Sequence, residues 1–84
     1  MNERGIILDM LNECKMDMEY RERRLEEVGN SNRTIRKNLQ EGIANTHTRM
    51  ETIVEIAYAL GIISEEESRM GLDTLIETIE DAYM

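Results

Sequence analysis

An apolar stripe at helical spacing, in a chain without proline, is the feature that most constrains the fold of this sequence. The stripe recurs in steps of four and three, and its members are Ile7, Leu11, Cys14, Met18, Arg21, Leu25 and Val28. This spacing places all of them on one face of an α-helix, which must pack against another element. Arg21 is the single polar member. It either snorkels from the stripe's edge or sets a register by pairing with a carboxylate across an interface. The stripe predicts a first helix over about residues 2–28.

The sequence after the stripe predicts a turn and a second helix. Gly29 supplies a residue that tolerates a left-handed stop, and Asn32 is a favourable N-cap. The second helix is expected over about residues 32–60. Residues 42–48 form helix poorly, and Thr48 with a glutamate three residues later reads as a fresh capping box. The second helix is therefore predicted either to continue through residues 42–48 or to bend or break there.

Two further signals predict a third helix. Gly61, followed by an apolar residue, fits a Schellman stop, and Ser64 with Glu67 forms the pattern of a capping box. The third helix is expected over about residues 64–83. No sustained alternation of apolar and polar residues predicts a strand. The chain, residues 1–84, is therefore predicted to be one all-α domain, a small bundle of three main helices with no β-sheet.

Charge is distributed unevenly along the chain, whose formal net charge is −8. Residues 20–40 hold six basic and three acidic side chains, whereas residues 64–84 hold seven acidic side chains against Arg69 alone. A field of this kind steers charged partners toward a surface. The predicted partner-binding acidic face consists of Glu65, Glu66, Glu67, Asp73, Glu77, Glu80 and Asp81.

Several classes of function lack their sequence patterns here. Cys14 is the only cysteine, so it forms neither an internal disulfide nor a cysteine-based zinc site, and a core thiol is its expected role. The sequence has no P-loop, no dinucleotide fingerprint and no calcium-loop spacing. No apolar run is long enough for a membrane span, and no stretch reads as a signal peptide. We therefore expect a cytoplasmic protein that is not an enzyme, with no cofactor, no metal site and no membrane contact.

One part of the chain, about residues 25–63, resembles a known family. The run Gly29-Asn-Ser-Asn-Arg-Thr-Ile35 is similar to the turn and recognition-helix start of lambda-repressor-type (Xre) helix-turn-helix regulators. The run Met50-Glu-Thr-Ile-Val-Glu-Ile-Ala-Tyr-Ala-Leu-Gly-Ile62 is similar to their fourth helix. The resemblance implies five short helices, a recognition helix in the major groove, and a dimer. The residues that it implies for DNA contact are Asn32, Arg33, Arg36 and Lys37.

The sequence thus leads to two hypotheses of function, beside a third possibility, a purely structural coiled-coil subunit that assembles through the first helix. The first is a small acidic protein that regulates another macromolecule by stoichiometric binding, in one version a phage or mobile-element inhibitor of a host nucleic-acid-binding protein. The second is an Xre-like DNA-binding transcriptional regulator. A core this small also favours self-association as a homodimer. The residues predicted for that contact are Ile7, Leu11, Cys14 and Met18.

Overall fold

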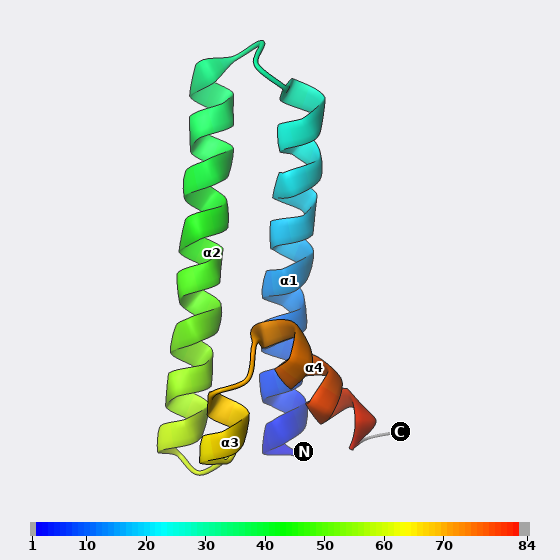
Figure 1. Ribbon diagram of the computed structural model, residues 1–84, viewed down its shortest axis with the longest axis vertical. Coiled ribbons are helices and arrows are strands. Elements are labelled where there is room, and N and C mark those ends of the chain that lie inside the picture. Colours follow the sequence, from blue (N-terminus) through cyan, green and yellow to red (C-terminus); the bar gives the residue numbers. More distant parts are fainter. Residues whose placement is uncertain (1, 83–84) are drawn as a thin grey trace.

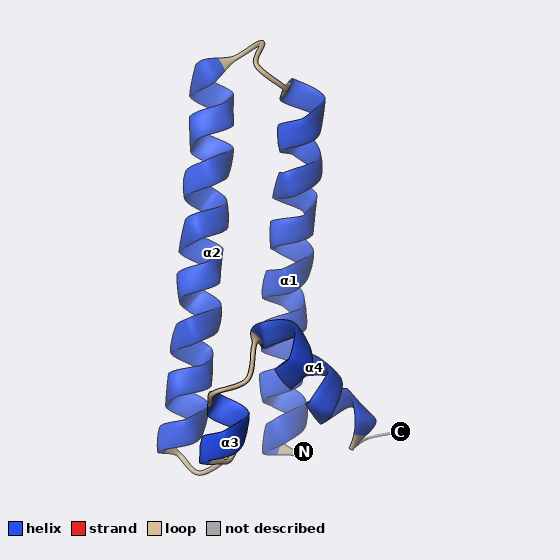
Figure 2. Cartoon of the chain, in the orientation of Figure 1, coloured by secondary structure: helices blue, strands red, loops and turns tan. Residues whose placement is uncertain are grey.

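The computed structural model describes residues 2–82, and its regular structure over that range is entirely helical (Figure 2). The helices are α1 (Glu3–Val28), α2 (Arg33–Ala59), α3 (Glu65–Ser68) and α4 (Leu72–Asp81). The two long helices α1 and α2 run antiparallel, side by side, and α3 and α4 lie at the end where α1 begins (Figure 1). The molecule measures 45 × 25 × 21 Å, and its length matches the roughly 40 Å of a 27-residue helix. The predicted all-helical class is confirmed.

The turn between α1 and α2 forms as its residues predict. Gly29 has φ 56°, and its N–H donates to the Leu25 carbonyl at 2.9 Å. The Ser31 hydroxyl donates to the Val28 carbonyl at 2.6 Å. The Asn32 side chain accepts from the Ile35 N–H at 3.1 Å and so caps α2. The predicted stop at Gly29 and the N-cap at Asn32 are both confirmed.

The end of α2 and the start of α3 also follow local chemistry. Gly61 has φ 75°, and the Ile62 N–H donates to the Ala57 carbonyl at 2.8 Å, which is the long bond of a Schellman motif. Ser64 and Glu67 form the predicted capping box in both directions. The Gly61 stop and the Ser64–Glu67 capping box therefore predict the end of α2 and the start of α3 correctly.

Helix α2 runs unbroken through residues 42–48, so the alternative of a break is wrong. The Thr48 hydroxyl donates to the Ala44 carbonyl at 3.1 Å inside the same helix, and it caps nothing. Gly42 lies against the guanidinium of Arg21, which a Cβ at position 42 would overlap. The glycine that weakens the helix pattern thus permits a close approach between the two long helices.

The predicted third helix over residues 64–83 is divided in the structure. It forms the short α3 and the longer α4, with residues 69–71 between them. Gly71 begins α4 with extended backbone, φ −62° and ψ 152°. This change of direction brings α4 back across α1 (Figure 1). There Leu75, Ile76 and Ile79 become buried. Tyr83, the predicted end of the helix, lies outside the described residues.

The architecture implied by the helix-turn-helix resemblance differs from the one found. The resemblance implied five short helices, whereas residues 2–82 form two long helices and two short ones. A helix-turn-helix places its two helices at about 90–120°, and here α1 and α2 lie side by side (Figure 1). The predicted DNA-contacting residues consequently occupy the tip of an antiparallel hairpin.

The hydrophobic core fills only the half of the hairpin that α3 and α4 cover. Leu11, Leu75 and Ile79 are fully buried there, at the junction of α1 and α4. Between Lys15 and Asn45 no side chain of the described chain reaches full burial. The hairpin therefore has a packed base and a thin tip. The whole core consists of Ile7, Leu11, Cys14, Met50, Ile53, Val54, Ala57, Ile63, Leu75, Ile76 and Ile79.

A polar cluster joins the two long helices beyond the core. Asp17 Oδ2 accepts from Arg21 Nε at 2.9 Å and from the Thr46 hydroxyl at 2.8 Å. Thr46 is 3% exposed, and it is the one buried polar residue within residues 2–82. The Arg21 hydrogen bond, followed by that of Thr46, lowers the pKa of the Asp17 carboxyl below its ordinary value. Because Asp17 and Arg21 lie on α1 and Thr46 on α2, the cluster favours one register of the hairpin.

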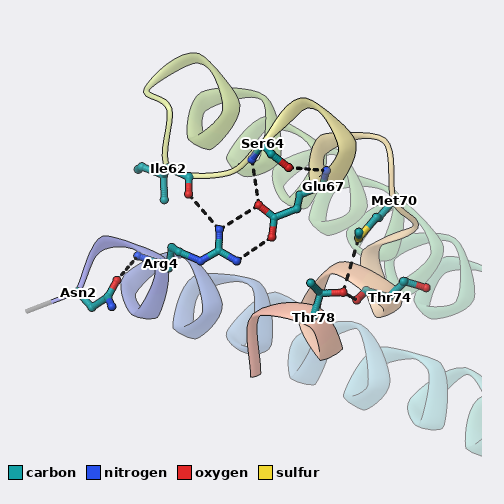
Figure 3. A network of polar contacts seen from close by, with 8 residues as sticks. All are labelled: Asn2, Arg4, Ile62, Ser64, Glu67, Met70, Thr74 and Thr78. Atoms are coloured by element: carbon teal, nitrogen blue, oxygen red, sulfur yellow. Dashed lines mark hydrogen bonds and ion pairs between the residues drawn. The ribbon is translucent and has the colours of Figure 1, made fainter. Parts of the chain in front are cut away.

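A second polar cluster fastens α3 to the start of α1 (Figure 3). Arg4 donates to both carboxylate oxygens of Glu67, at 2.9 and 2.7 Å, and to the Ile62 carbonyl at 3.2 Å. The Arg4 bonds, with a further bond from the Ser64 N–H, lower the pKa of the Glu67 carboxyl from 4.5 to about 2. Glu67 therefore completes the capping box and ties α3 to α1 at once.

We predict that Gly42→Ala stabilises the protein by about 0.5 kcal/mol. Alanine gains about 1 kcal/mol over glycine inside a helix, and the half-exposed Arg21 loses an ion pair worth about 0.5 kcal/mol when it moves aside. Urea unfolding measures the difference. In an Arg21→Ala background the same substitution should gain the full amount of about 1 kcal/mol. A destabilising Gly42→Ala would contradict this account of the helix contact.

We predict that the Arg4–Glu67 pair makes folding stability depend on acid pH. A lowered pKa in the folded state stabilises the protein above about pH 4.5, and this contribution disappears as the pH falls toward 2. The shift corresponds to at most about 3 kcal/mol, and solvent around Arg4 screens part of it, so the expected loss is about 2 kcal/mol. Urea unfolding at pH 5 and pH 2 should show this loss in the wild type and in Glu66→Gln. Glu67→Gln should lack this contribution and keep only the smaller acid dependence of the other carboxyls, such as Asp17. An equal acid dependence in all three proteins would refute the assignment.

Candidate functional site

A groove opens where α1, α2 and the start of α4 meet, just beyond the packed base. Its volume is about 830 Å³. Met50 and Val54 are buried at its floor, and the other apolar side chains there are half-buried. We call this hollow the acidic groove, because its rim is formed mainly by carboxylates. The apolar floor consists of Met18, Met50, Val54, Met70 and Leu72.

The rim carboxylates come from three helices. On α1, Glu19 and Glu22 are three residues apart, and on α2, Glu51 and Glu55 are four apart, so each pair lies on one helix face. Asp73 of α4 completes the set. All five side chains are exposed. None of the four glutamates belongs to the predicted acidic face. The spacing within each pair is visible in the sequence, but the two pairs lie next to each other only in the folded hairpin.

Two basic groups also line the acidic groove. Lys15 Nζ lies 3.4 Å from Asp73 Oδ1; the Lys15 side chain is half-buried and that of Asp73 is largely exposed. His47 Nδ1 lies 2.8 Å from Glu51 Oε1, a contact that is an ion pair only when the imidazole is protonated. Five carboxylates against one lysine leave the rim strongly negative at neutral pH.

The exposed side of α4 carries a second group of carboxylates, which adjoins the groove through Asp73. Three members are exposed and Glu80 is half-buried, and the described residues of α4 include no basic side chain. The group, here called the α4 ridge, consists of Asp73, Glu77, Glu80 and Asp81. The structure thus brings together four of the seven residues predicted to form the acidic face.

The other three predicted acidic residues lie on α3 and are used differently. Glu67 is held by Arg4, and its side chain is 14% exposed. Glu65 pairs with Arg69 at 2.6 Å. Glu66 is exposed. Arg4 already engages the Glu67 carboxylate in the fold, and the binding of a partner by the other six residues stays a prediction.

The basic tip holds the residues implied for DNA contact, and their local roles differ. Asn32 caps α2, Arg36 donates to the Gly29 carbonyl at 3.0 Å, and Lys37 lies 3.9 Å from Glu41. Arg33 is exposed and makes no ion pair with any residue of the described range 2–82. The hairpin therefore brings all four residues to one end of the molecule, where Arg33 is the cation most available to a partner.

The residues predicted for self-association lie inside the chain instead. Ile7, Leu11 and Cys14 are buried against α2 and α4, and Met18 packs at the edge of the same core. Helical spacing identifies a face that must be covered, but it does not say whether the chain itself or a second copy covers it. In the folded chain these four residues contact the chain's own core, and the homodimer stays a prediction.

Neither a metal cluster nor a membrane helix occurs among the residues that the structure describes. No three His, Cys, Asp or Glu side chains are placed to hold a metal ion in residues 2–82. Over the same range no helix combines the length and the apolar character needed to cross a membrane.

Comparison with known proteins gives no significant match. No protein-family model matches the chain, and neither the curated proteins nor the solved structures give a significant similarity to it.

Proposed function

We propose that the chain is a non-enzymatic interaction protein that regulates another macromolecule by binding it stoichiometrically. The observation that supports this proposal is the continuous acidic surface made by the rim of the groove and the α4 ridge. Eight carboxylates lie on it, and Lys15 and His47 are the basic groups among its described residues. Surfaces of a single charge sign speed encounter with a partner of opposite sign and exclude partners of the same sign. The expected partner is therefore a protein with a basic surface.

In its finer form the proposal makes the chain an inhibitor of a nucleic-acid-binding protein, of the kind that phages and mobile elements carry. Proteins that bind nucleic acid present basic stripes to the phosphates. Carboxylates four residues apart on α4, such as Glu77 and Asp81, are displaced by about 6 Å along the helix axis. A row of acidic groups on a rigid helix can occupy such a stripe, and nucleic acid should then compete with the chain for its partner.

We predict that neutralising the α4 ridge weakens capture of the partner. The immobilised wild type should retain a specific protein from a nuclease-treated bacterial lysate at low salt, and added nucleic acid should displace it. Glu77→Gln/Glu80→Gln/Asp81→Asn should lower affinity about tenfold, from roughly 0.5 kcal/mol for each of three screened pairs. Titration of the identified partner by calorimetry measures both affinity and stoichiometry.

A matched control separates local contacts from net charge. Glu3→Gln/Glu13→Gln/Glu26→Gln also removes three negative charges, all at exposed positions outside the acidic surface. It should bind the partner as the wild type does. Equal weakening by both triple variants, or no retained protein at low salt, counts against the proposed function.

The second candidate function is DNA binding by the basic tip, in line with the helix-turn-helix resemblance. The observation that favours it is that Arg33 and Arg23 are exposed and unpaired within residues 2–82. Cations in such positions are free to contact phosphates, with an affinity that falls steeply with salt.

We predict, for this second candidate, salt-dependent binding to mixed double-stranded DNA in fluorescence anisotropy. Arg33→Gln/Lys37→Gln should abolish it, and this variant leaves the bond from Arg36 to the Gly29 carbonyl intact. Lys15→Gln/Arg49→Gln removes the same charge elsewhere and should bind as the wild type does. Absence of binding at low salt removes DNA from consideration and leaves the protein partner.

A further inference from the structure

We propose that the acidic groove binds a basic amphipathic helix of the protein partner. The inference rests on the proposed function, and it specifies which part of the acidic surface is the primary contact and what it recognises. The groove has the two features that such a segment requires, an apolar floor and acidic walls on both sides. A purely acidic surface such as the α4 ridge has only the second.

The position of the groove favours a helix as the occupant. Helix α4 lies across the base of the hairpin and forms the third helix of a bundle there (Figure 1). The groove continues the same face of the hairpin toward the tip, beyond the start of α4. A segment of about ten residues would form a helix of roughly 15 Å, which is the length of α4 itself. The partner helix would then pack on the half of this face nearer the tip, as α4 packs on the half nearer the base.

The floor suits an apolar side chain of varied shape. Three of its five members are methionines, which adapt to different partner surfaces. Met18 and Met70 are half-buried, so an incoming side chain can reach them, whereas Met50 is 3% exposed and forms the base. The Thr78 hydroxyl contacts Met70 Sδ at 3.6 Å and holds that side chain beside the groove (Figure 3).

The walls select a basic helix over an acidic or neutral one. Glu19 and Glu22 form the α1 side, Glu51 and Glu55 the α2 side, and Asp73 the α4 end. A helix that presents leucines to the floor and lysines or arginines to each flank would meet carboxylates on both sides. An acidic helix would be repelled by like charges in a partly desolvated site. Charge complementarity therefore fixes the chemistry of the segment.

The direct test uses three fluorescein-labelled 14-residue peptides. The first carries leucine at helical spacing on one face and lysine elsewhere, the second has the same composition with the leucines dispersed, and the third replaces lysine by glutamate. Fluorescence anisotropy at physiological salt should show saturable one-to-one binding of the first peptide. We expect at least tenfold weaker binding of the second and none of the third. Equal affinity for the first two would overturn the inference, because the floor would then play no part.

Methyl NMR of the full chain with labelled methionine locates the peptide. The Met18, Met50 and Met70 methyl signals should shift on titration. Met10 and Met16 should not, because Met10 lines a separate, smaller hollow formed by residues of α1 and α2, and Met16 is 69% exposed outside the groove. Shifts confined to Met10 and Met16 would place the peptide elsewhere and reject the groove.

Charge-reversal variants separate the groove from the ridge. Glu22→Lys/Glu55→Lys should weaken the first peptide at least tenfold, whereas Glu13→Lys/Glu26→Lys, with the same change in net charge, should leave it within twofold. If only Glu77→Gln/Glu80→Gln/Asp81→Asn weakens the peptide, the groove is rejected and an acidic binding surface on α4 remains.

Two further outcomes concern the partner itself. If the peptide binds the groove but the chain retains no protein from the lysate, the proposed function fails, whereas binding of a basic helix by the groove is still supported. Concentration-dependent oligomers that the first peptide dissociates would identify a second copy as the occupant and overturn the proposal.

Discussion

The antiparallel contact between α1 and α2 is the interaction on which the rest of the structure depends. Its apolar part lies at the base, where Leu11 and Ala57 are completely buried. Its polar part lies higher, where Asp17 of α1 accepts from Thr46 of α2, and Arg21 lies against Gly42. The apolar part drives the association, and the polar part resists a slip along the helices, because a one-turn shift would leave Thr46 buried without its acceptor. Once this register is fixed, the surfaces of α1 and α2 on which α3 and α4 pack are fixed as well.

The uneven core explains why the two ends of the hairpin differ. Helix α4 inserts Leu75, Ile76 and Ile79 over the base, and this third layer completes the burial of Leu11. No third helix covers the tip, so Leu25 and Leu39 stay half-buried there. A segment with few buried apolar contacts opens more easily than the core. The acidic groove lies at the boundary between these regions, where the apolar face of the hairpin continues but α4 does not.

Features of the fold could be predicted from the sequence when the residues that cause them lie close together in the chain. Gly29, Gly61 and the Ser64 capping box act within one helical turn, and the sequence predicted all three correctly. The break near Gly71 was missed, because it depends on the burial that α4 gains by turning onto α1. Thr48 matched a capping pattern and yet lies inside a continuous helix, since tertiary packing overrides weak local preferences. The face of α1 was identified, but its partner was not, because periodicity does not distinguish a contact within the chain from one between copies.

The candidate site could be predicted only where its residues lie close together in the chain. The acidic residues of α4 lie on one helix at intervals of three and four residues, so a shared face follows from helical spacing alone. The pairs Glu19 with Glu22 and Glu51 with Glu55 lie about 30 residues apart in the sequence, and only the hairpin register brings them to one groove. The pairing of Glu67 with Arg4 could not be predicted, because Arg4 lies at the other end of the chain.

The carboxylates of the two polar clusters differ in their surroundings from those of the acidic groove and the α4 ridge. Glu67 and Asp17 accept hydrogen bonds from arginine, and their pKa values are lowered because the fold stabilises the ionised form. The carboxylates of the groove and the α4 ridge stand close to one another with few bases between them, and like charges at such spacings destabilise a helix slightly. Hydrogen bonds in the fold thus stabilise Glu67 and Asp17, whereas the carboxylates of the groove and the α4 ridge repel one another. A basic partner would relieve that repulsion, so the same charges that cost stability in the free protein would contribute affinity in the complex.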